Sequence, residues 1–344
     1  MRAKKVANIR MLVADVIVWG LLCVLVVLGL VFAGDIRQYS SISLRFDLPI
    51  SGRAAYAARQ YSITHSKENT FWPTFWTEYK ASFSSELVTA DANCIAYSGD
   101  ASLVWPAEYV SGAAPGVIDD SGCSVSEALA CKLWGSTDVV GMAVEIDGAG
   151  RSVRGVFRGK EELAMISFRD EDATGNWHAV ELDSGSGNAT RDDAERYAIA
   201  SGLGNPDIIL MGNLSSLARL MMALPLLILA IYCLGLILDF VRKRYPTMRK
   251  LVPFLILFAF VALLPAMLGR FPEWLIPTRW SDFSFWDSLL AQASNGLREF
   301  LRAAPQSRDV VFRMQILRLT GVAVLAVCLS LTACLRWHIQ GIRG

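Results

Sequence analysis

Histidine is scarce in this 344-residue chain, which has only His65, His178 and His338. None of the three stands at a spacing from cysteine, glutamate or another histidine that is typical of a zinc site. The acidic runs at 170–172 and 192–193 have the composition of solvated turns rather than of calcium-binding loops. The sequence therefore predicts no metal site.

Motifs for catalysis and for nucleotide binding are also missing. No serine outside the apolar runs stands in the G-x-S-x-G pattern of a nucleophile elbow. Gly159 and Lys160 resemble the end of a phosphate-binding loop, but Arg154 occupies the place of its first glycine and Glu161 replaces the required serine or threonine. We therefore expect no enzyme activity, no cofactor, no ATP site in this chain and no nucleic-acid partner.

Charge is scarce as well: charged residues make up 19% of the chain, whereas hydrophobic residues make up 53%. The apolar residues gather in four uncharged runs, at 16–33, 220–238, 251–268 and 319–335. At roughly 1.5 Å per residue, each run comes close to the roughly 30 Å of hydrocarbon in a bilayer. The sequence predicts four transmembrane helices, at 11–33, 217–240, 251–269 and 319–336. The first run is also compatible with a cleaved signal peptide that ends at Ala33.

The few charges are distributed unevenly. The tail at 1–10 and the loop at 241–250 hold basic residues and no acidic ones, whereas residues 34–219 hold 15 basic and 25 acidic residues. Short basic loops stay in the cytoplasm. We therefore expect a multi-pass plasma-membrane protein with the 241–250 loop and both tails, 1–10 and 337–344, in the cytoplasm. Residues 34–216 and 270–318 would lie outside, although the latter hold seven basic residues against five acidic ones and fit the rule poorly.

Periodicity within residues 34–216 predicts a mixed domain of helices and strands. Aromatic residues from Phe71 to Phe83 recur at spacings of three and four, which favours an amphipathic helix over a cage of aromatic rings around a ligand. A helix is also expected at 191–201, and the helical pattern from Leu214 runs without a strong break into the second span. Strands are expected at 42–46, 82–90, 93–98, 164–168, 178–182 and 208–211.

The segment at 270–318 contains a second amphipathic pattern. Its apolar face is formed by Leu289, Ala293, Leu297, Phe300 and Leu301. Tryptophans precede this face at positions 274, 280 and 286, and indole rings prefer the membrane interface. Two interpretations stay open: a helix that lies in the membrane interface, and a helix that packs on the domain formed by 34–216.

The stretch from Ser124 to Phe157 carries the most specific structural signal. Ser124 and Glu127 have the S-x-x-E spacing of a capping box, so a helix is expected to begin here. Gly135 follows the last apolar position of this helix and is a typical terminating residue. A polar turn and two alternating apolar runs, separated by the turn formers Asp147-Gly148, then predict a β-hairpin.

This order of elements resembles the periplasmic core domain of MacB-type ABC transporter permeases. The resemblance is carried by Ser126, Glu127, Leu129, Ala130, Lys132, Leu133, Trp134, Gly135, Val140, Gly141, Val153, Gly155 and Val156. It implies an α+β extracytoplasmic domain inserted between one leading span and a three-helix transmembrane bundle, as in MacB-type and FtsX-like systems. It also implies a permease-like subunit that forms a homodimer or heterodimer and transmits the motion of a cytoplasmic ABC ATPase to the outer domain.

The resemblance places the ATPase contact between the second and third spans. The residues there are Arg242, Lys243, Arg244, Tyr245, Arg249 and Lys250. The family has a longer segment at this place, with an arginine-x-x-glutamate-isoleucine run, whereas this segment has no acidic residue and is interrupted by Pro246. The basic run is therefore also compatible with a topology signal or a contact to anionic lipid. The alternative function is a membrane-anchored extracytoplasmic sensor or scaffold without an ATPase partner.

Three cysteines, Cys94, Cys123 and Cys131, lie in the segment expected outside the cell, where a disulfide is permitted. Cys123 and Cys131 flank the expected helix and would be roughly 11 Å apart along its axis, which is too far for a bond. The sequence therefore favours a pairing of Cys94 with Cys123, and three free thiols are the alternative.

Overall fold

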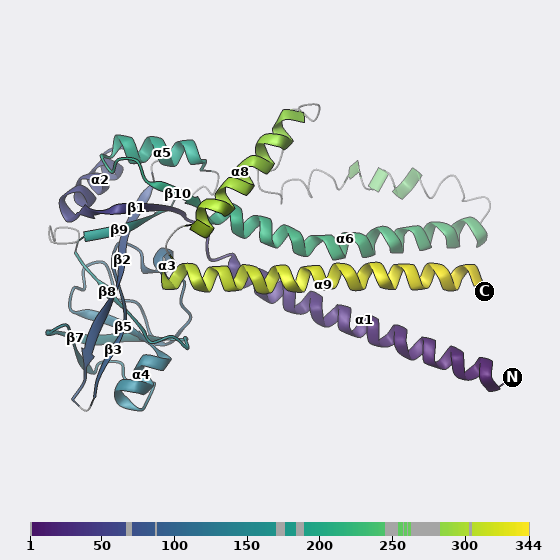
Figure 1. The fold of residues 1–344 in the computed structure, drawn as a ribbon, viewed down its shortest axis with the longest axis horizontal. Coiled ribbons are helices and arrows are strands. Elements are labelled where there is room, and N and C mark those ends of the chain that lie inside the picture. The colour runs from purple at the N-terminus through teal and green to yellow at the C-terminus, as the bar shows by residue number, and fades with distance from the viewer. Residues whose placement is uncertain are drawn as a thin grey trace. The chain divides into compact units, whose positions relative to one another are not determined.

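The structure of the protein is a computed structural model that describes residues 2–66, 71–86, 88–169, 176–183, 189–244, 254–256, 258–259, 261–262, 283–302 and 305–343 (Figure 1). The helices are α1 Arg2–Ile36, α2 Gly52–Thr64, α3 Ala101–Val104, α4 Glu127–Trp134, α5 Arg191–Ala200, α6 Met211–Arg244, α8 Phe283–Arg302 and α9 Ser307–Arg343. The strands are β1 Ile42–Ser51, β2 Trp72–Ser84, β3 Thr89–Ser98, β4 Tyr109–Gly112, β5 Gly122–Ser126, β6 Ala143–Ile146, β7 Ala149–Phe157, β8 Leu163–Ser167, β9 Asn176–Asp183 and β10 Asp207–Leu210.

The chain divides into two compact units. Residues 39–213 and 293–311 form one unit, which we call the sheet domain because it holds all the described strands. Residues 1–38, 214–292 and 312–344 form the other, which we call the helical unit. Helix α9 therefore begins in the sheet domain and continues in the helical unit, and α8 is divided after Gln292.

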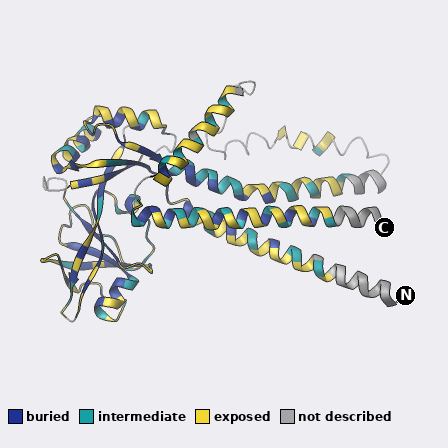
Figure 2. Cartoon of the chain, viewed as in Figure 1, coloured by how far each residue is buried: buried dark blue, intermediate teal, exposed yellow. Residues whose placement is uncertain are grey.

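Three helices in the described part of the chain are long and apolar enough to cross a bilayer. The apolar segments are Val16–Ile36 in α1, Met211–Leu238 in α6 and Ser307–Arg336 in α9. Many of their large side chains are exposed, which suits surfaces that face lipid (Figure 2). The predicted span 251–269 lies outside the described residues, apart from seven helical residues between 254 and 262.

The sheet domain is built on one ten-stranded mixed sheet, in the order β10-β1-β9-β2-β3-β8-β5-β7-β4. Strand β6 pairs with both β2 and β7, so β2, β3, β8, β5, β7 and β6 close into a ring. Helices α2 and α5 lie over β1, β9 and β10 and contribute Ala58, Ala194 and Ala198 to the main core (Figure 1). The predicted α+β domain between the first apolar helix and the later ones is confirmed.

Most of the predicted elements of this domain are present. Strands β1, β3, β8, β9 and β10 and helix α5 occur where alternation or helical periodicity placed them. The expected strand 82–90 instead covers the end of β2 and the start of β3.

Residues 71–83 were expected to form an amphipathic helix, and this prediction is wrong: they lie almost entirely in strand β2. β2 pairs with β3 over ten residues and with β9 near its start. Phe71, Phe75 and Phe83 enter the main core, whereas Trp76 belongs to a second cluster. Residues spaced by four share one face of a strand as well as of a helix, and aromatic residues favour strands.

Helix α4 begins two residues later than the S-x-x-E spacing predicted. Its N-cap is Ser126, whose hydroxyl accepts a hydrogen bond from the Leu129 amide at 3.2 Å, and Glu127 is its first residue. Ser124 lies in β5, because pairing with β7 keeps the chain extended as far as Ser126. The predicted terminator is confirmed, since Gly135 ends the helix with a left-handed φ of 70°.

The predicted hairpin is formed by β6 and β7, with Asp147 and Gly148 in its turn at φ angles of 49° and 82°. Gly141 precedes it at φ 91°. A Cβ atom at Gly155 would lie 2.5 Å from the carbonyl oxygen of Ala113. Glycine at 155 therefore allows the chain after β4 to approach β7.

Candidate functional site

The sheet domain contains a cluster of charged side chains in its interior, centred on Glu181 of β9. The Glu181 side chain is fully buried and accepts hydrogen bonds from Ser41 Oγ at 2.6 Å and Ser43 Oγ at 2.7 Å. Trp76 Nε1 donates a third bond at 3.1 Å. A buried carboxylate needs such donors and a countercharge, because it has lost its hydration.

Arg308, in the first turn of α9, supplies the nearest countercharge. Its Nη1 atom pairs with a carboxylate oxygen of Glu181, and its Nη2 atom donates to Ser41 Oγ at 3.1 Å. The guanidinium lies 5.5 Å from the ring centre of Tyr39 and 5.9 Å from that of Trp76, so cation–π attraction adds to the ion pair. The side chain of Arg308 is only 1% exposed.

Arg45 of β1 and Asp309 of α9 form the second ion pair of the cluster. Arg45 Nη2 lies 2.9 Å from Asp309 Oδ1 and 3.8 Å from Glu181 Oε1. Arg45 also donates to the side chain of Gln306 and lies 4.8 Å from the Trp76 ring centre. Burial lowers the pKa of Arg45, and the charges of Asp309 and Glu181 oppose this effect.

We call Arg45, Glu181, Arg308 and Asp309 the ion-pair cluster. Its two cations and two anions balance, and both acids and Arg308 are at most 1% exposed. Removing one member leaves a buried charge without its partner, which typically costs about 3–5 kcal/mol. The cluster therefore fastens the first turn of α9 to strands β1 and β9.

Glu78 of β2 provides another attachment for the same turn. It accepts hydrogen bonds from the backbone N–H of Ser307 at 2.7 Å and from the Ser307 hydroxyl. Asn93 Nδ2 of β3 donates to Ser307 Oγ at 3.1 Å. A carboxylate at the start of a helix is stabilised by the exposed amides and by the helix dipole. Helix α9 is thus capped by the sheet itself.

An open groove of about 390 Å³ lies beside this cap. Glu161 lines it together with Tyr79, Lys80 and Val310. Partial burial raises the pKa of Glu161, and the charge of Glu78 adds to this shift.

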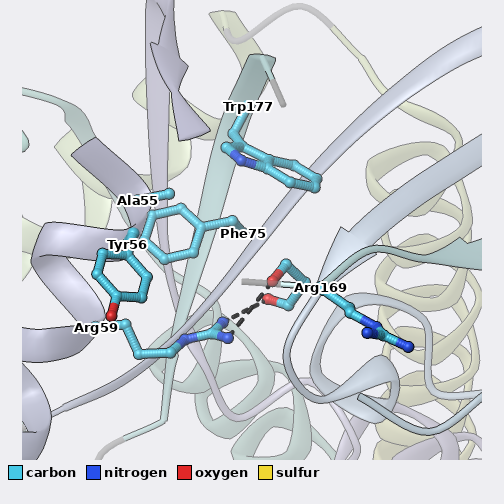
Figure 3. A pocket seen from close by; sticks show the side chains of 7 residues that line it. Ala55, Tyr56, Arg59, Phe75, Arg169 and Trp177 are labelled. Carbon is cyan, nitrogen blue, oxygen red and sulfur yellow. Dashed lines mark hydrogen bonds between the residues drawn. The ribbon is translucent and has the colours of Figure 1, made fainter. Parts of the chain in front are cut away.

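A smaller cavity lies between α2 and the sheet, beside Arg59 (Figure 3). Arg59 donates to the carbonyl oxygens of Ser98 at 2.8 Å and Pro73 at 3.2 Å, and burial lowers its pKa to about 10. The cavity holds about 10 Å³, which is room for roughly one water molecule. Arg59 therefore serves to fasten α2 to the sheet.

The proposed ATPase-contact residues fall at the end of the described part of α6. The backbone of Arg242, Lys243 and Arg244 is helical, whereas Tyr245, Arg249 and Lys250 lie outside the described residues. Their contact with an ATPase stays a prediction. Within the described ranges, no group of three or more histidine, cysteine, aspartate or glutamate side chains is arranged to hold a metal ion.

The expected disulfide between Cys94 and Cys123 is absent, and both residues are buried free thiols. Cys94 lies in β3 and Cys123 in β5, and β8 runs between these two strands. Adjacent strands are about 4.8 Å apart, so two residues separated by a third strand are about 10 Å apart. A disulfide needs Cα atoms within about 7 Å. The sheet order therefore excludes this pairing.

Burial raises the pKa of both Cys94 and Cys123 to about 12, whereas Cys131 is exposed on α4. At pH 8 we expect a polar maleimide to label Cys131 and to react with the two buried thiols roughly a thousandfold more slowly. Mass spectrometry of labelled peptides measures this difference. After unfolding without reductant, all seven cysteines should react. A count of five reactive thiols would instead indicate that two cysteines are joined in a disulfide.

Sequence reasoning did not identify the ion-pair cluster. Its partners are far apart in the chain, with Arg45 and Asp309 separated by 264 positions. The available signal was a charged residue between apolar neighbours in an expected strand: Arg45 between Leu44 and Phe46, and Glu181 between Val180 and Leu182. In both strands the charged side chain, Arg45 or Glu181, lies inside the domain.

No protein-family model and no curated protein matches this chain. Among solved structures, it is similar to the extracellular domain of the noncanonic ABC-type transporter YknZ from Gram-positive bacteria, with 12% identity, a TM-score of 0.39, and coverage of 48% of this chain and 94% of that one. It is also similar to the periplasmic region of MacB from Actinobacillus actinomycetemcomitans, with 11% identity, a TM-score of 0.40, and coverage of 50% and 89%.

Proposed function

We propose that this chain is a permease-like subunit of an ABC transporter of MacB/FtsX type. It carries the motion of a cytoplasmic ATPase across the membrane to an extracytoplasmic sheet domain. In this proposal the chain works as a homodimer or heterodimer, and both tails lie in the cytoplasm. It binds no nucleotide itself, so the ATPase is a separate subunit.

The observation that carries the proposal is the attachment of α9. This helix runs from Ser307 to Arg343, and the ion-pair cluster and Glu78 hold its first turn on the sheet. A continuous helix is a rigid element, and rigid elements can transmit coupling between distant sites. A displacement of the apolar part of α9 would therefore reach β1 and β9.

Helix α6 supports the proposal in a second way. It begins at Met211, directly after strand β10, and its described part ends at Arg244. The same helix would therefore join the sheet to the basic run at 242–250. An ATPase that binds Arg242, Lys243 and Arg244 would act on α6 directly, because these three residues are part of the helix.

The test is co-purification of the full chain with an ABC ATPase from its native membrane. Changing Arg242, Lys243 and Arg244 to alanine should reduce the bound ATPase by at least about tenfold, which corresponds to about 1.4 kcal/mol. In the matched control Arg2, Lys4 and Lys5, another basic run expected in the cytoplasm, are changed to alanine. This variant should bind as much ATPase as the wild-type chain. Purification of the intact wild-type chain without any ATPase would favour the membrane-anchored sensor or scaffold instead.

A further inference from the structure

Helix α8 has a stripe of exposed apolar side chains along one side. Trp286, Leu290, Leu297 and Leu301 are 39%, 66%, 44% and 58% exposed. At about 100° per residue these four positions fall within an arc of roughly 60° on the helix. The stripe therefore lies on one side, and polar residues such as Asp287, Ser288 and Asn295 lie outside it.

The two halves of α8 have different environments. In the second half, Glu299 pairs with Arg191 of α5 at 2.8 Å and Phe300 is 1% exposed, so this half is fastened within the sheet domain. Residues 283–292 belong instead to the helical unit, together with the membrane-length helices. Two large apolar side chains of this first half, Trp286 and Leu290, are exposed, whereas Phe285 and Leu289 are half-buried.

We propose that the first half of α8 lies in the membrane–water interface on the extracytoplasmic side, with Trp286 and Leu290 inserted among the lipids. Chain connectivity supports this location, because only residues 270–282 separate the helix from the predicted span 251–269. Indole rings prefer the interfacial region, and a helix with one apolar and one polar side lies in its plane.

The exposed area favours lipid over a protein partner. A stable protein interface buries about 800 Å² on each partner, whereas an aromatic side chain contributes about 150–250 Å² even when it is fully buried. Even the whole stripe, Trp286, Leu290, Leu297 and Leu301 at 39–66% exposure, therefore provides too little surface for a second copy of the chain. Insertion into a bilayer needs no such minimum area.

The charge of this half specifies the type of lipid contact. Residues 283–292 contain Asp287 and neither lysine nor arginine. Attraction to anionic headgroups therefore contributes nothing, and the contact depends on the apolar side chains alone. Zwitterionic and anionic bilayers should serve equally well.

Photo-crosslinking of the full chain in phosphatidylcholine vesicles tests this location. p-Benzoylphenylalanine at position 290 should give a lipid adduct detectable by mass spectrometry, at least about tenfold above that at position 288 on the polar side of the same helix. Position 48 is a second control, because Leu48 is 81% exposed on β1 of the sheet domain. Adding phosphatidylglycerol should leave the yield at 290 unchanged.

A crosslink from 290 to a second copy, to the sheet domain or to no target would overturn the proposal. Equal lipid adducts at 288 and 290 would also overturn it, since lipid would then contact the polar and the apolar side of the helix alike. The same probe at position 286, in a separate variant, should also give a lipid adduct. Agreement between the two variants would show that the result at 290 does not come from misfolding of one protein. No ATPase is present in these vesicles, so the result is independent of the function proposed above.

Discussion

Changing Glu181 to glutamine should lower the free energy of unfolding of the sheet domain by about 3–5 kcal/mol. The substitution keeps the shape of the side chain but removes its charge, which leaves Arg45 and Arg308 with Asp309 as the one remaining acid of the cluster. Three hydrogen-bond donors also lose a charged acceptor. Denaturant unfolding of the detergent-solubilised full chain, followed by tryptophan fluorescence, measures the loss.

The matched control is Glu108 changed to glutamine. Glu108 pairs with Arg158 at 2.9 Å, but the two side chains are 72% and 64% exposed, so the loss should stay below about 1 kcal/mol. A double variant with Glu181 changed to glutamine and Arg308 to methionine should recover part of the loss, because it removes both charges of the pair. Equal losses for Glu181 and Glu108 would mean that the cluster does not hold α9 on the sheet.

The parts of the fold that sequence predicted well depend on local interactions. Gly135 ends α4 because the end of that helix needs a left-handed residue, and Asp147-Gly148 forms a turn that needs two such conformations. Both requirements are satisfied within a few residues. The start of α4 was misplaced from Ser126 to Ser124, because the pairing of β5 with β7 is a long-range interaction that no local spacing reveals.

Strand β2 illustrates an ambiguity of spacing. Phe71, Phe75 and Phe83 are separated by multiples of four, which places them on one side of either a helix or a strand. The composition of β2, with its tryptophans, phenylalanines and threonines, favours the strand. Spacing alone could not decide between the two structures.

The candidate site required the tertiary fold. Arg45, Glu181 and Arg308 come from three distant segments, and a single charged residue in a strand gives no indication of its partner. The cysteines show the same limit, since the distance between Cys94 and Cys123 depends on β8 lying between their strands. Strand order is a property of the whole domain.

The rigidity of α9 leads to the second large effect. Leu317 lies between the fastened first turn and the apolar run that begins at Leu319, and it is 65% exposed. Proline at this position removes the backbone N–H of residue 317 and clashes with the preceding turn, at a cost of about 3 kcal/mol to the helix. Because Leu317 is exposed and the ion-pair cluster is separate from it, the stability of the sheet domain should change by less than about 0.5 kcal/mol.

If α9 transmits motion, changing Leu317 to proline should therefore uncouple the sheet domain while leaving it folded. A polar fluorophore on Cys131, the exposed thiol of α4, reports ATP-dependent change in the complex purified with its ATPase. We expect the proline variant to lose most of this response and the control, Leu317 changed to alanine, to keep it. A full response in the proline variant would assign the coupling to α6 instead. No response in the wild-type complex would contradict the coupling function itself, because a helix that carries motion must move the domain to which its first turn is fastened.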